Sequence, residues 1–496
     1  MFQKITPESA GISSKNVRKF VERLEKRGAS THGILFMKGD KVFAENYWKP
    51  FHVDYNHRMY SETKSFVSVA IGLLEEEGKL SLDDTIVSHF PEKMDGEPQK
   101  YLDKLTIRDM LTMRTTGEPA GWFSSSDEDR VHIFLNTARN FPHPSGTLWG
   151  YDSASTQTLC TLVEKISGMR LLDYLKLKLF NEMDAFQNAT ILRTKNGDTW
   201  GDSALIATVR DMAKFGRFLL NYGTWNGKRL MNEKYLREAT SRLVASMDGG
   251  HISCSYNQGY GYQFWRVCGN GFALIGMGDQ LTVCYPDKDL VFVYVSDNQG
   301  KKNMIREMIF ANLEDLIIDE MSDSPIEEDE IEQKKLDEYL STLELRAIKG
   351  LPDSDFRGEL DGQEYICEEN RMGIKKFSFH FKNENEGEFR YENAQGEKVL
   401  PFGVNYNVFG EFPQLGYSGD FGGKPTFDGS KYHDAVSFAW LENKNIIIFV
   451  QIIDRYFGNA CFQFCFKDND VCARFTKAAE AFLYEYEGSL IAHKKI

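Results

Sequence analysis

The predicted strands of this 496-residue chain fall into separate clusters, and their placement limits the folds that it can adopt. A hairpin is expected at 33–47, where two apolar runs flank a Lys-Gly-Asp turn. Residues 120–230 show mainly helical spacing. Further strands are expected only later, before a helix at 304–321, and they lie at 260–265, 272–275, 281–285 and 290–295. We therefore predict an α/β (α+β) domain with flanking helices and a helical subdomain, whose antiparallel sheet is built from both ends of this region.

The composition changes after this region. Residues 322–330 are acidic, a short helix follows at 333–345, and the rest consists of apolar runs separated by Gly and Asn turns. An all-β barrel or sandwich is expected there. The predicted division is 1–321, a linker with a short helix at 322–345, and a β-rich domain at 346–496 for which the sequence indicates no chemistry.

One tetrapeptide, Ser61 to Lys64, is the only Ser-x-x-Lys in the chain, and it opens an apolar helical run that ends near Gly78. Residues three apart share a helix face, so the Ser61 hydroxyl and the Lys64 ammonium can meet at the helix N-terminus. A serine attacks an acyl carbon only when a neighbouring group takes its proton, and unpaired N–H groups at a helix start can stabilise an oxyanion. The pair favours nucleophilic acyl transfer, although the same spacing also occurs on solvated helix surfaces.

Composition excludes several classes of partner. The net charge is −14 and the pI is near 5.4, which argues against nucleic acid or an anionic membrane. No apolar leader opens the chain and no apolar run approaches membrane-spanning length, so we expect a cytoplasmic protein without a membrane partner.

The cysteines and histidines show no metal-ligand spacing, so we expect no metal and no cofactor. We also expect the cysteines to be reduced core thiols rather than disulfides, because they form no CxxC and lie mostly in apolar surroundings. They are Cys160, Cys254, Cys268, Cys284, Cys367, Cys461, Cys465 and Cys472.

Four segments in order resemble the serine β-lactamase and penicillin-binding-protein superfamily. They are TPESAGISS at 6–14, the Ser-x-x-Lys itself, GKLSLDD at 78–84 and LTIRDMLTMRTTG at 105–117. The chain is most similar to the class C β-lactamase-like branch, which includes family VIII esterases, D-aminopeptidases and 6-aminohexanoate-dimer hydrolases. The resemblance covers roughly residues 5–320.

In that superfamily a Tyr-x-Asn motif faces the serine, and the matching residues here are Tyr151 and Ser153. The resemblance implies that the phenol accepts or relays the serine proton, and that Ser153, in place of Asn, bonds to Lys64 or to substrate. Taken alone, Tyr151 could be an ordinary half-buried loop residue. Trp149 and Trp122 could line the acyl pocket or could be packing aromatics.

The third motif is usually Lys-Thr-Gly or His-x-Gly on a strand edge, and here the matching turn holds Gly276, Gly278 and Gln280 without a cation. The family's cation helps to hold the carboxylate of β-lactams and D-Ala-D-Ala peptides, so its absence lowers the expectation for both substrates. These three residues are expected to contact substrate, and a backbone N–H of this edge is expected to join that of Ser61 as the oxyanion hole. A plain glycine-rich turn is the alternative. The tripeptide 296–298, Ser-Asp-Asn, resembles a class A motif but follows the third motif, in the wrong order.

The resemblance and the residues together predict a serine acyl hydrolase. Ser61 attacks a carbonyl, Lys64, desolvated in the site, acts with Tyr151 as base, and water releases the acyl group. A small ester, amide or short peptide is the expected partner, and the oligomeric state stays open. The alternatives are β-lactamase or D-amino-acid peptidase activity, or a penicillin-binding receptor-like homologue with little turnover.

Overall fold

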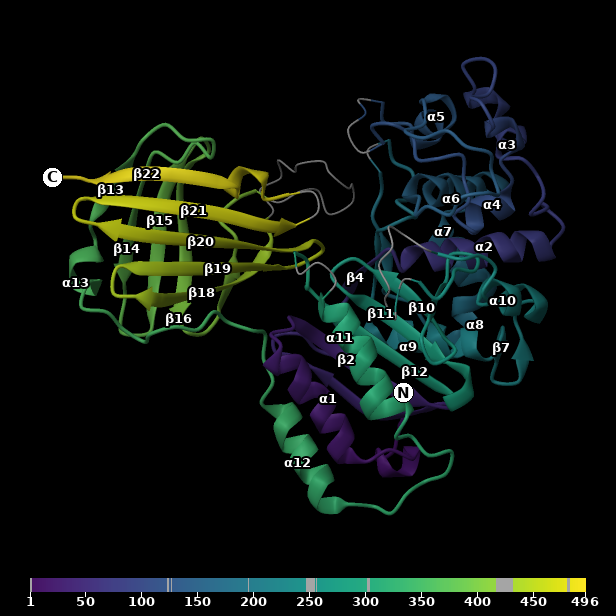
Figure 1. Ribbon diagram of the computed structural model, residues 1–496, viewed down its shortest axis with the longest axis horizontal. Coiled ribbons are helices and arrows are strands. Elements are labelled where there is room, and N and C mark those ends of the chain that lie inside the picture. Colours follow the sequence, from purple (N-terminus) through teal and green to yellow (C-terminus); the bar gives the residue numbers. More distant parts are fainter. Residues whose placement is uncertain are drawn as a thin grey trace. The chain divides into compact units, whose positions relative to one another are not determined.

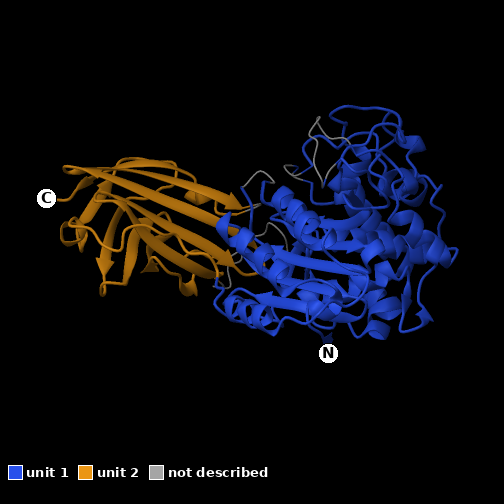
Figure 2. Ribbon diagram, turned by 60° about the horizontal axis from the view of Figure 1, so that its bottom comes forward, with its two compact units in different colours: residues 1–344, 420–422 blue, residues 345–419, 423–496 orange. Residues whose placement is uncertain are grey.

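The chain divides into two compact units, the first ending at Glu344 and the second beginning at Leu345 (Figure 2). The computed structural model describes residues 2–122, 125, 127–194, 196–246, 255, 257–300, 304–415, 431–479 and 482–496. Within these residues no helix is both long and apolar enough to cross a membrane.

The first unit is built on a seven-stranded sheet in the order β1-β3-β2-β12-β11-β10-β9 (Figure 1). The N-terminal hairpin joins the later strands because β2 pairs with β12, which confirms a sheet assembled from both ends. The sheet is mixed rather than wholly antiparallel, since β1 lies parallel to β3 at the edge. The strands are β1 (Gln3–Lys4), β2 (Thr31–Lys38), β3 (Lys41–Tyr47), β9 (Trp265–Val267), β10 (Gly271–Gly276), β11 (Gln280–Tyr285) and β12 (Leu290–Ser296).

Residues 260–264, predicted as part of a strand, form a turn instead. Gln263 has a left-handed φ of +64°, and its N–H donates to the Leu111 carbonyl. The N–H of Tyr262 donates to the Ala239 carbonyl. Two N–H groups of this aromatic segment thus donate to the last residues of helices, Tyr260 pairs with Val244 in an isolated bridge, and only Trp265–Val267 joins the sheet.

Alternate side chains of the sheet enter two cores, as the two-residue repeat of a strand requires. Leu35 and Met37 pack with α2 (Thr63–Glu76) and α9 (Val209–Leu220). Ile34 and Phe36 pack on the other face with α1 (Ser14–Lys26) and α11 (Met304–Leu313). The first core continues into the helical subdomain, so α2 is buried on all sides from Thr63 to Leu74.

The remaining elements of the first unit are short, except for the 15-residue α6. The helices are α3 (Ile86–His89), α4 (Ile107–Leu111), α5 (Arg130–Asn136), α6 (Ser153–Ser167), α7 (Leu171–Leu175), α8 (Asn181–Met183) and α10 (Glu233–Ala239). The small sheets are β4 (His57–Tyr60) with β6 (Leu205–Ala207) and β5 (Thr190–Ile191), and β7 (Thr224–Trp225) with β8 (Lys228–Arg229). A π-helical turn, η6 (Glu314–Ile318), follows α11, so the predicted helix 304–321 is shorter and changes its winding.

The acidic segment after residue 321 lies in the first unit. It contains α12 (Glu330–Ser341), whose Leu336 and Leu340 enter the core beside α1. Arg18 of α1 donates to Glu332 at 2.9 Å.

The second unit is a closed β-barrel, which is one of the two folds predicted for it, a barrel or a sandwich. Its strands follow the order β16-β15-β14-β13-β22-β21-β20-β19-β18, and β16 also pairs with β18, which closes a ring of nine strands; β17 extends the β18 edge. The interior is filled by aromatic rings, among them Phe379, Phe389 and Phe464, whose centroids lie 5.2–5.4 Å apart. The elements are α13 (Arg357–Leu360), β13 (Glu364–Cys367), β14 (Lys376–Phe381), β15 (Glu386–Asn393), β16 (Gly396–Val404), β17 (Val408–Glu411), β18 (His433–Glu442), β19 (Asn445–Ile453), β20 (Phe457–Lys467), β21 (Asp470–Ala479) and β22 (Gly488–Lys494).

The prediction that the cysteines are core thiols is right for Cys160 and Cys284, which are buried, and wrong for Cys465 and Cys472, which are exposed. The apolar run around Cys465 alternates with a period of two, so its phenylalanines fill the barrel and its cysteine faces outward. Cys254 lies outside the described residues.

Candidate active site

The Ser61 hydroxyl and the Lys64 ammonium meet at the start of α2. The Lys64 Nζ lies 3.1 Å from the Ser61 Oγ. Ser61 is half-buried between β4 and α2, and the residue before it, Tyr60, has a φ of +47°. A bulky residue rarely adopts this backbone conformation, which costs about 1–3 kcal/mol and is found mainly where the surrounding structure demands it. Here it turns the chain from strand to helix directly before the hydroxyl.

The Lys64 side chain is almost fully buried and has a second partner, Asp202. Its Nζ donates to the Asp202 main-chain carbonyl at 2.7 Å and lies 3.8 Å from the Asp202 carboxylate. Burial raises the pKa of the Asp202 carboxyl, while the cations of Lys64, Arg130 and Arg58 oppose this shift. Asp202 thus feels three basic side chains, of which Lys64 contacts it directly.

Tyr151 lies beside the same ammonium. The Lys64 Nζ is 5.0 Å from the centroid of the Tyr151 ring, within the range of a cation–π contact. The Tyr151 ring stacks on Trp265 at 5.6 Å, and Trp149 packs edge-on against Trp265 at the same separation. Among the described residues, the structure thus unites Ser61, Lys64 and Tyr151 and adds an aromatic wall.

Ser153 is the first residue of α6 and is half-buried. No hydrogen bond joins its hydroxyl to Lys64 in the part of the chain that the structure describes. The preceding residue, Asp152, caps the helix by accepting from the Ser155 N–H at 3.2 Å. The N-terminal end of α6 therefore holds the Tyr151 loop in place.

The third-motif turn joins β10 to β11 and touches the strand that carries the nucleophile. A Cβ at Gly276 would lie 2.2 Å from the Met59 carbonyl oxygen, so only glycine allows this approach. Gly278 has a φ of +75°, which also favours glycine. Gly276 thus lets the turn pack against Met59, which is two residues before Ser61 in the sequence, and Gly278 allows the backbone conformation of the turn.

Gln280 is fully buried, and its side-chain amide bonds to main-chain groups around the turn. Its Nε2 donates to the Ser296 carbonyl at 2.7 Å and to the Met277 carbonyl at 2.9 Å. The Ser296 hydroxyl donates to the Gly278 carbonyl at 2.6 Å, and the Asn298 N–H donates to the same oxygen at 3.1 Å. The Ser-Asp-Asn tripeptide is therefore a brace for the turn.

The turn lacks a cation of its own, but Arg306 of α11 lies behind it. The Arg306 Nε donates to the Asp279 carboxylate at 3.0 Å, and both side chains are 5% exposed. Burial lowers the pKa of the Arg306 guanidinium to about 10. The charge is thus engaged by Asp279, which holds the turn against α11.

A buried acid lies under the nucleophile. The Glu62 carboxylate accepts from the Thr282 hydroxyl at 2.6 Å, and burial raises the pKa of this carboxyl well above its usual range. Burial therefore favours the neutral acid, and the bond ties the residue directly before α2 to β11. The sequence pattern does not predict the burial of Glu62, because a glutamate at the start of a helix is usually exposed to solvent.

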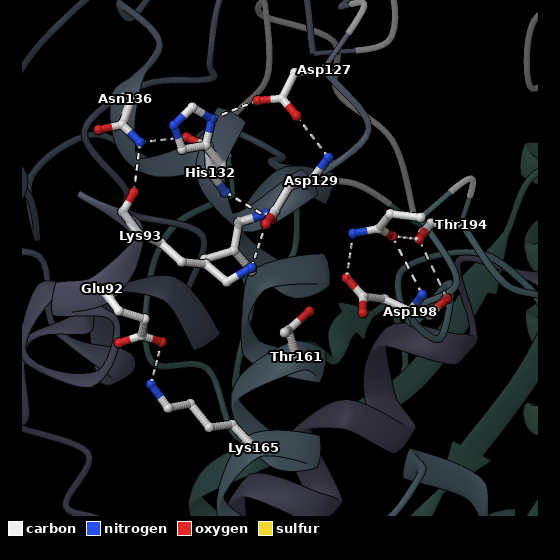
Figure 3. Close-up of polar contacts among 12 residues, drawn as sticks. Glu92, Lys93, Asp127, Asp129, His132, Asn136, Thr161, Lys165, Thr194 and Asp198 are labelled. Carbon is white, nitrogen blue, oxygen red and sulfur yellow. Dashed lines mark hydrogen bonds and ion pairs between the residues drawn. The ribbon is translucent and has the colours of Figure 1, made fainter. Parts of the chain in front are cut away.

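Another cluster of charged side chains joins α5 to the segment before it (Figure 3). The His132 Nδ1 lies 2.5 Å from the Asp127 carboxylate, and its Nε2 lies 3.0 Å from Asp95. Asp129 caps α5 and pairs with Lys93. Hydrogen bonds to Asp95 and Asp127 raise the pKa of His132. Within the described ranges, no three metal-ligating side chains converge.

Sequence reasoning missed Asp202, Arg306 and Trp265. Asp202 contacts Lys64 through a main-chain oxygen, and any residue type can supply one. Arg306 and Trp265 lie far from Ser61 along the chain, and only the folded sheet brings them near the site.

The fold and this constellation define a β-lactamase-like hydrolase. The chain belongs to the Beta-lactamase family, whose model matches residues 15–313. This confirms the resemblance predicted from the motifs.

One relative by sequence and two solved structures are similar to this chain. A 6-aminohexanoate-dimer hydrolase of Paenarthrobacter ureafaciens is 28% identical over 297 residues, which are 55% of this chain and 74% of that protein. A Bacillus anthracis protein proposed to be a 6-aminohexanoate-dimer hydrolase shares the fold with a TM-score of 0.51 at 19% identity, covering 63% of this chain and 87% of its own. A penicillin-binding protein homologue of Caulobacter crescentus has a TM-score of 0.50 at 16% identity, covering 62% and 98%. The protein is thus related to 6-aminohexanoate-dimer hydrolases.

Gly276→Ala tests the close approach of the turn to the nucleophile. The added Cβ must displace the Met59 carbonyl, and a shift of about 1 Å at a reacting group costs on the order of 100-fold in rate. We expect this loss in the rate at which an acyl or phosphonate reagent labels the enzyme. Gly96→Ala is the control because a Cβ there meets nothing within 4 Å. Equal labelling of the two variants would contradict the tight contact.

His132→Gln tests the charged cluster. The folded pKa of His132 is raised, so its contribution to stability is full below the unfolded pKa of about 6.5 and is lost as pH rises through the folded value. With its side chain 35% exposed, screening limits the effect to about 1 kcal/mol or less. Thermal unfolding should show the variant less stable at pH 6 and nearly equal to wild type at pH 9. His143→Gln is the control, since that ring bonds to a backbone carbonyl. A pH-independent difference would refute the assignment.

Proposed function

We propose that the protein is a serine acyl hydrolase that acts on a small ester or amide through an acyl-enzyme on Ser61. One observation carries the proposal: a buried lysine Nζ lies 3.1 Å from the Ser61 hydroxyl and 5.0 Å from the Tyr151 ring. An amine within hydrogen-bond reach of a hydroxyl is the arrangement that an activated serine requires, and the Tyr151 ring lies beside that amine.

In the proposed reaction the Ser61 oxygen attacks the carbonyl carbon, and Lys64 acts with Tyr151 to take the hydroxyl proton. The same groups return a proton to the leaving alcohol or amine. Water then attacks the acyl-enzyme, and Ser61 is restored. The Asp202 carbonyl keeps the Lys64 Nζ pointed at the hydroxyl throughout, because its hydrogen bond at 2.7 Å fixes the end of a flexible side chain.

The negative charge that forms on the substrate oxygen needs donors. We propose the backbone N–H of Ser61 and an N–H of the 276–278 edge, because Gly276 packs against Met59 on the strand that leads to the nucleophile. The brace formed by Ser296 and Gln280 supports this role, since it fixes the turn before a substrate binds.

The surroundings favour an uncharged or flexible acyl group. The wall beside Tyr151 is made of Trp265 and Trp149, and the buried Arg306 is engaged by Asp279. A small ester or amide therefore fits this proposal better than a carboxylate-bearing β-lactam or D-amino-acid peptide. The relation to a 6-aminohexanoate-dimer hydrolase supports an aliphatic amide as one candidate.

A second candidate is a penicillin-binding homologue that is acylated but turns over slowly. Two departures from the family motifs favour it: Ser153 stands where Asn is usual, and the third-motif turn has no free cation. Both candidates share the acyl-enzyme and differ only in its hydrolysis.

A fluorophosphonate probe tests the nucleophile. We expect labelling of Ser61 by peptide mass spectrometry, with none in Ser61→Ala and a rate reduced about 100-fold or more in Tyr151→Phe, the size of a general-base contribution. Ser65→Ala is the matched control, because Ser65 lies on the same helix and bonds to the Gln263 carbonyl. Labelling at any serine other than Ser61 would exclude this mechanism.

Substrate assays separate the candidates. We expect p-nitrophenyl butyrate to be cleaved with many turnovers and faster than nitrocefin, since the third-motif turn at 276–280 carries no cation to hold a β-lactam carboxylate. The linear dimer of 6-aminohexanoate tests the amide. A burst of one product per enzyme followed by a stable adduct supports the slow homologue instead. Faster cleavage of nitrocefin would overturn the preference for esters.

A further inference from the structure

The outer face of the β-barrel carries two exposed cysteines that oppose each other on neighbouring strands. Cys465 of β20 and Cys472 of β21 are direct partners in the antiparallel register, and both are free. Direct partners in such a pair have Cα atoms about 4.5 or 5.5 Å apart. A disulfide spans Cα separations of about 4.4–6.8 Å, so either kind of pair brings the thiols within bonding range.

The barrel core holds this register. Phe464 and Phe466 alternate with Cys465 and point inward, and the hairpin closes tightly between Lys467 and Asp470. A slip of one residue would turn the phenylalanines to solvent, so the cysteines remain opposite each other.

The other thiols of the barrel have different partners. Cys461 faces Thr476, and Cys367 faces Ala492. On the strands next to the pair, Asn445 of β19 lies opposite Cys465, and Ile491 of β22 lies opposite Cys472. Each sulfur of the pair therefore has the other as its nearest cross-strand thiol among the described residues.

We propose that Cys465 and Cys472 form a reversible dithiol–disulfide site that closes by exchange with a small disulfide such as glutathione disulfide. One protein thiolate attacks a glutathione sulfur, the glutathione S–S bond breaks, and one glutathione leaves as a thiol. The second protein thiol then attacks the mixed disulfide, and the second glutathione leaves. The protein loses two protons and two electrons, and glutathione disulfide is reduced to two thiols.

Either thiol can make the first attack, because the two lie opposite each other and the remaining thiol is within reach of the mixed disulfide in both cases. Burial, together with Cys472 and Glu442, raises the pKa of the Cys465 thiol. This site is independent of Ser61 and does not require the proposed hydrolase activity.

The test treats the reduced full-length protein with glutathione disulfide and maps peptides without reduction. We expect a 465–472 cross-link within one chain, with the mixed disulfide at these two cysteines about tenfold or more less abundant, because the second thiol resolves it at high effective concentration. A glutathione adduct at Cys461, which faces Thr476, should persist. Dithiothreitol should restore both thiols. Phenylarsine oxide, which bridges paired thiols, should be retained by the wild type and lost from Cys465→Ser and Cys472→Ser.

Three variants make the result specific. Cys472→Ser should accumulate glutathione on Cys465, and Cys461→Ser should cross-link at the wild-type rate. The double variant Cys472→Ser with Arg474→Cys moves the thiol two residues along the same face of β21. The new cysteine lies opposite Gln463 and diagonal to Cys465, about 7–8 Å away, so cross-linking should be at least tenfold slower. Glutathione on both cysteines without a cross-link, or cross-links only between chains, would overturn the proposal.

Discussion

The site depends on a buried lysine whose ammonium is held by three different kinds of group. A charged side chain loses its hydration on burial, and this loss must be offset by close polar partners. The Ser61 hydroxyl, the Asp202 carbonyl and the Tyr151 ring supply them, each from a different part of the chain. The same contacts that compensate the burial also aim the amine at the hydroxyl, so stability and chemistry rest on one arrangement.

The surrounding structure keeps this arrangement by bracing backbone rather than by adding catalytic side chains. Gly276 lets the third-motif turn approach Met59. Hydrogen bonds of Gln280 and Ser296 brace the turn, and Arg306 ties it to α11 through Asp279. Two segments that resemble catalytic or binding motifs in the sequence have structural contacts in the fold. The Ser-Asp-Asn tripeptide braces the turn, and Gln280 is an internal support.

Sequence predicted what depends on local pattern and on motif order. The Ser61–Lys64 contact follows from helical spacing, and the sheet built from both ends follows from where the apolar strands lie. What it missed depends on distant contacts. Residues 260–264 are apolar enough for a strand, yet the N–H groups of Tyr262 and Gln263 donate to carbonyls at the ends of two helices. Asp202 contributes a main-chain oxygen that no side-chain pattern marks. In the barrel, side chains around Cys465 alternate between the interior and the outer face. A prediction from the average hydrophobicity of the segment does not show this alternation.

The central position of β2 beside β12 has a consequence for biosynthesis. The ribosome releases β2 and the buried helix α2 long before it makes β12 (Leu290–Ser296), the strand that pairs with β2. Until then twelve consecutive residues of α2, Thr63 to Leu74, lack the core that buries them in the finished protein. The nascent chain therefore exposes its nucleophile helix throughout most of the synthesis of the first unit, and the active site is assembled only after residue 296 has emerged.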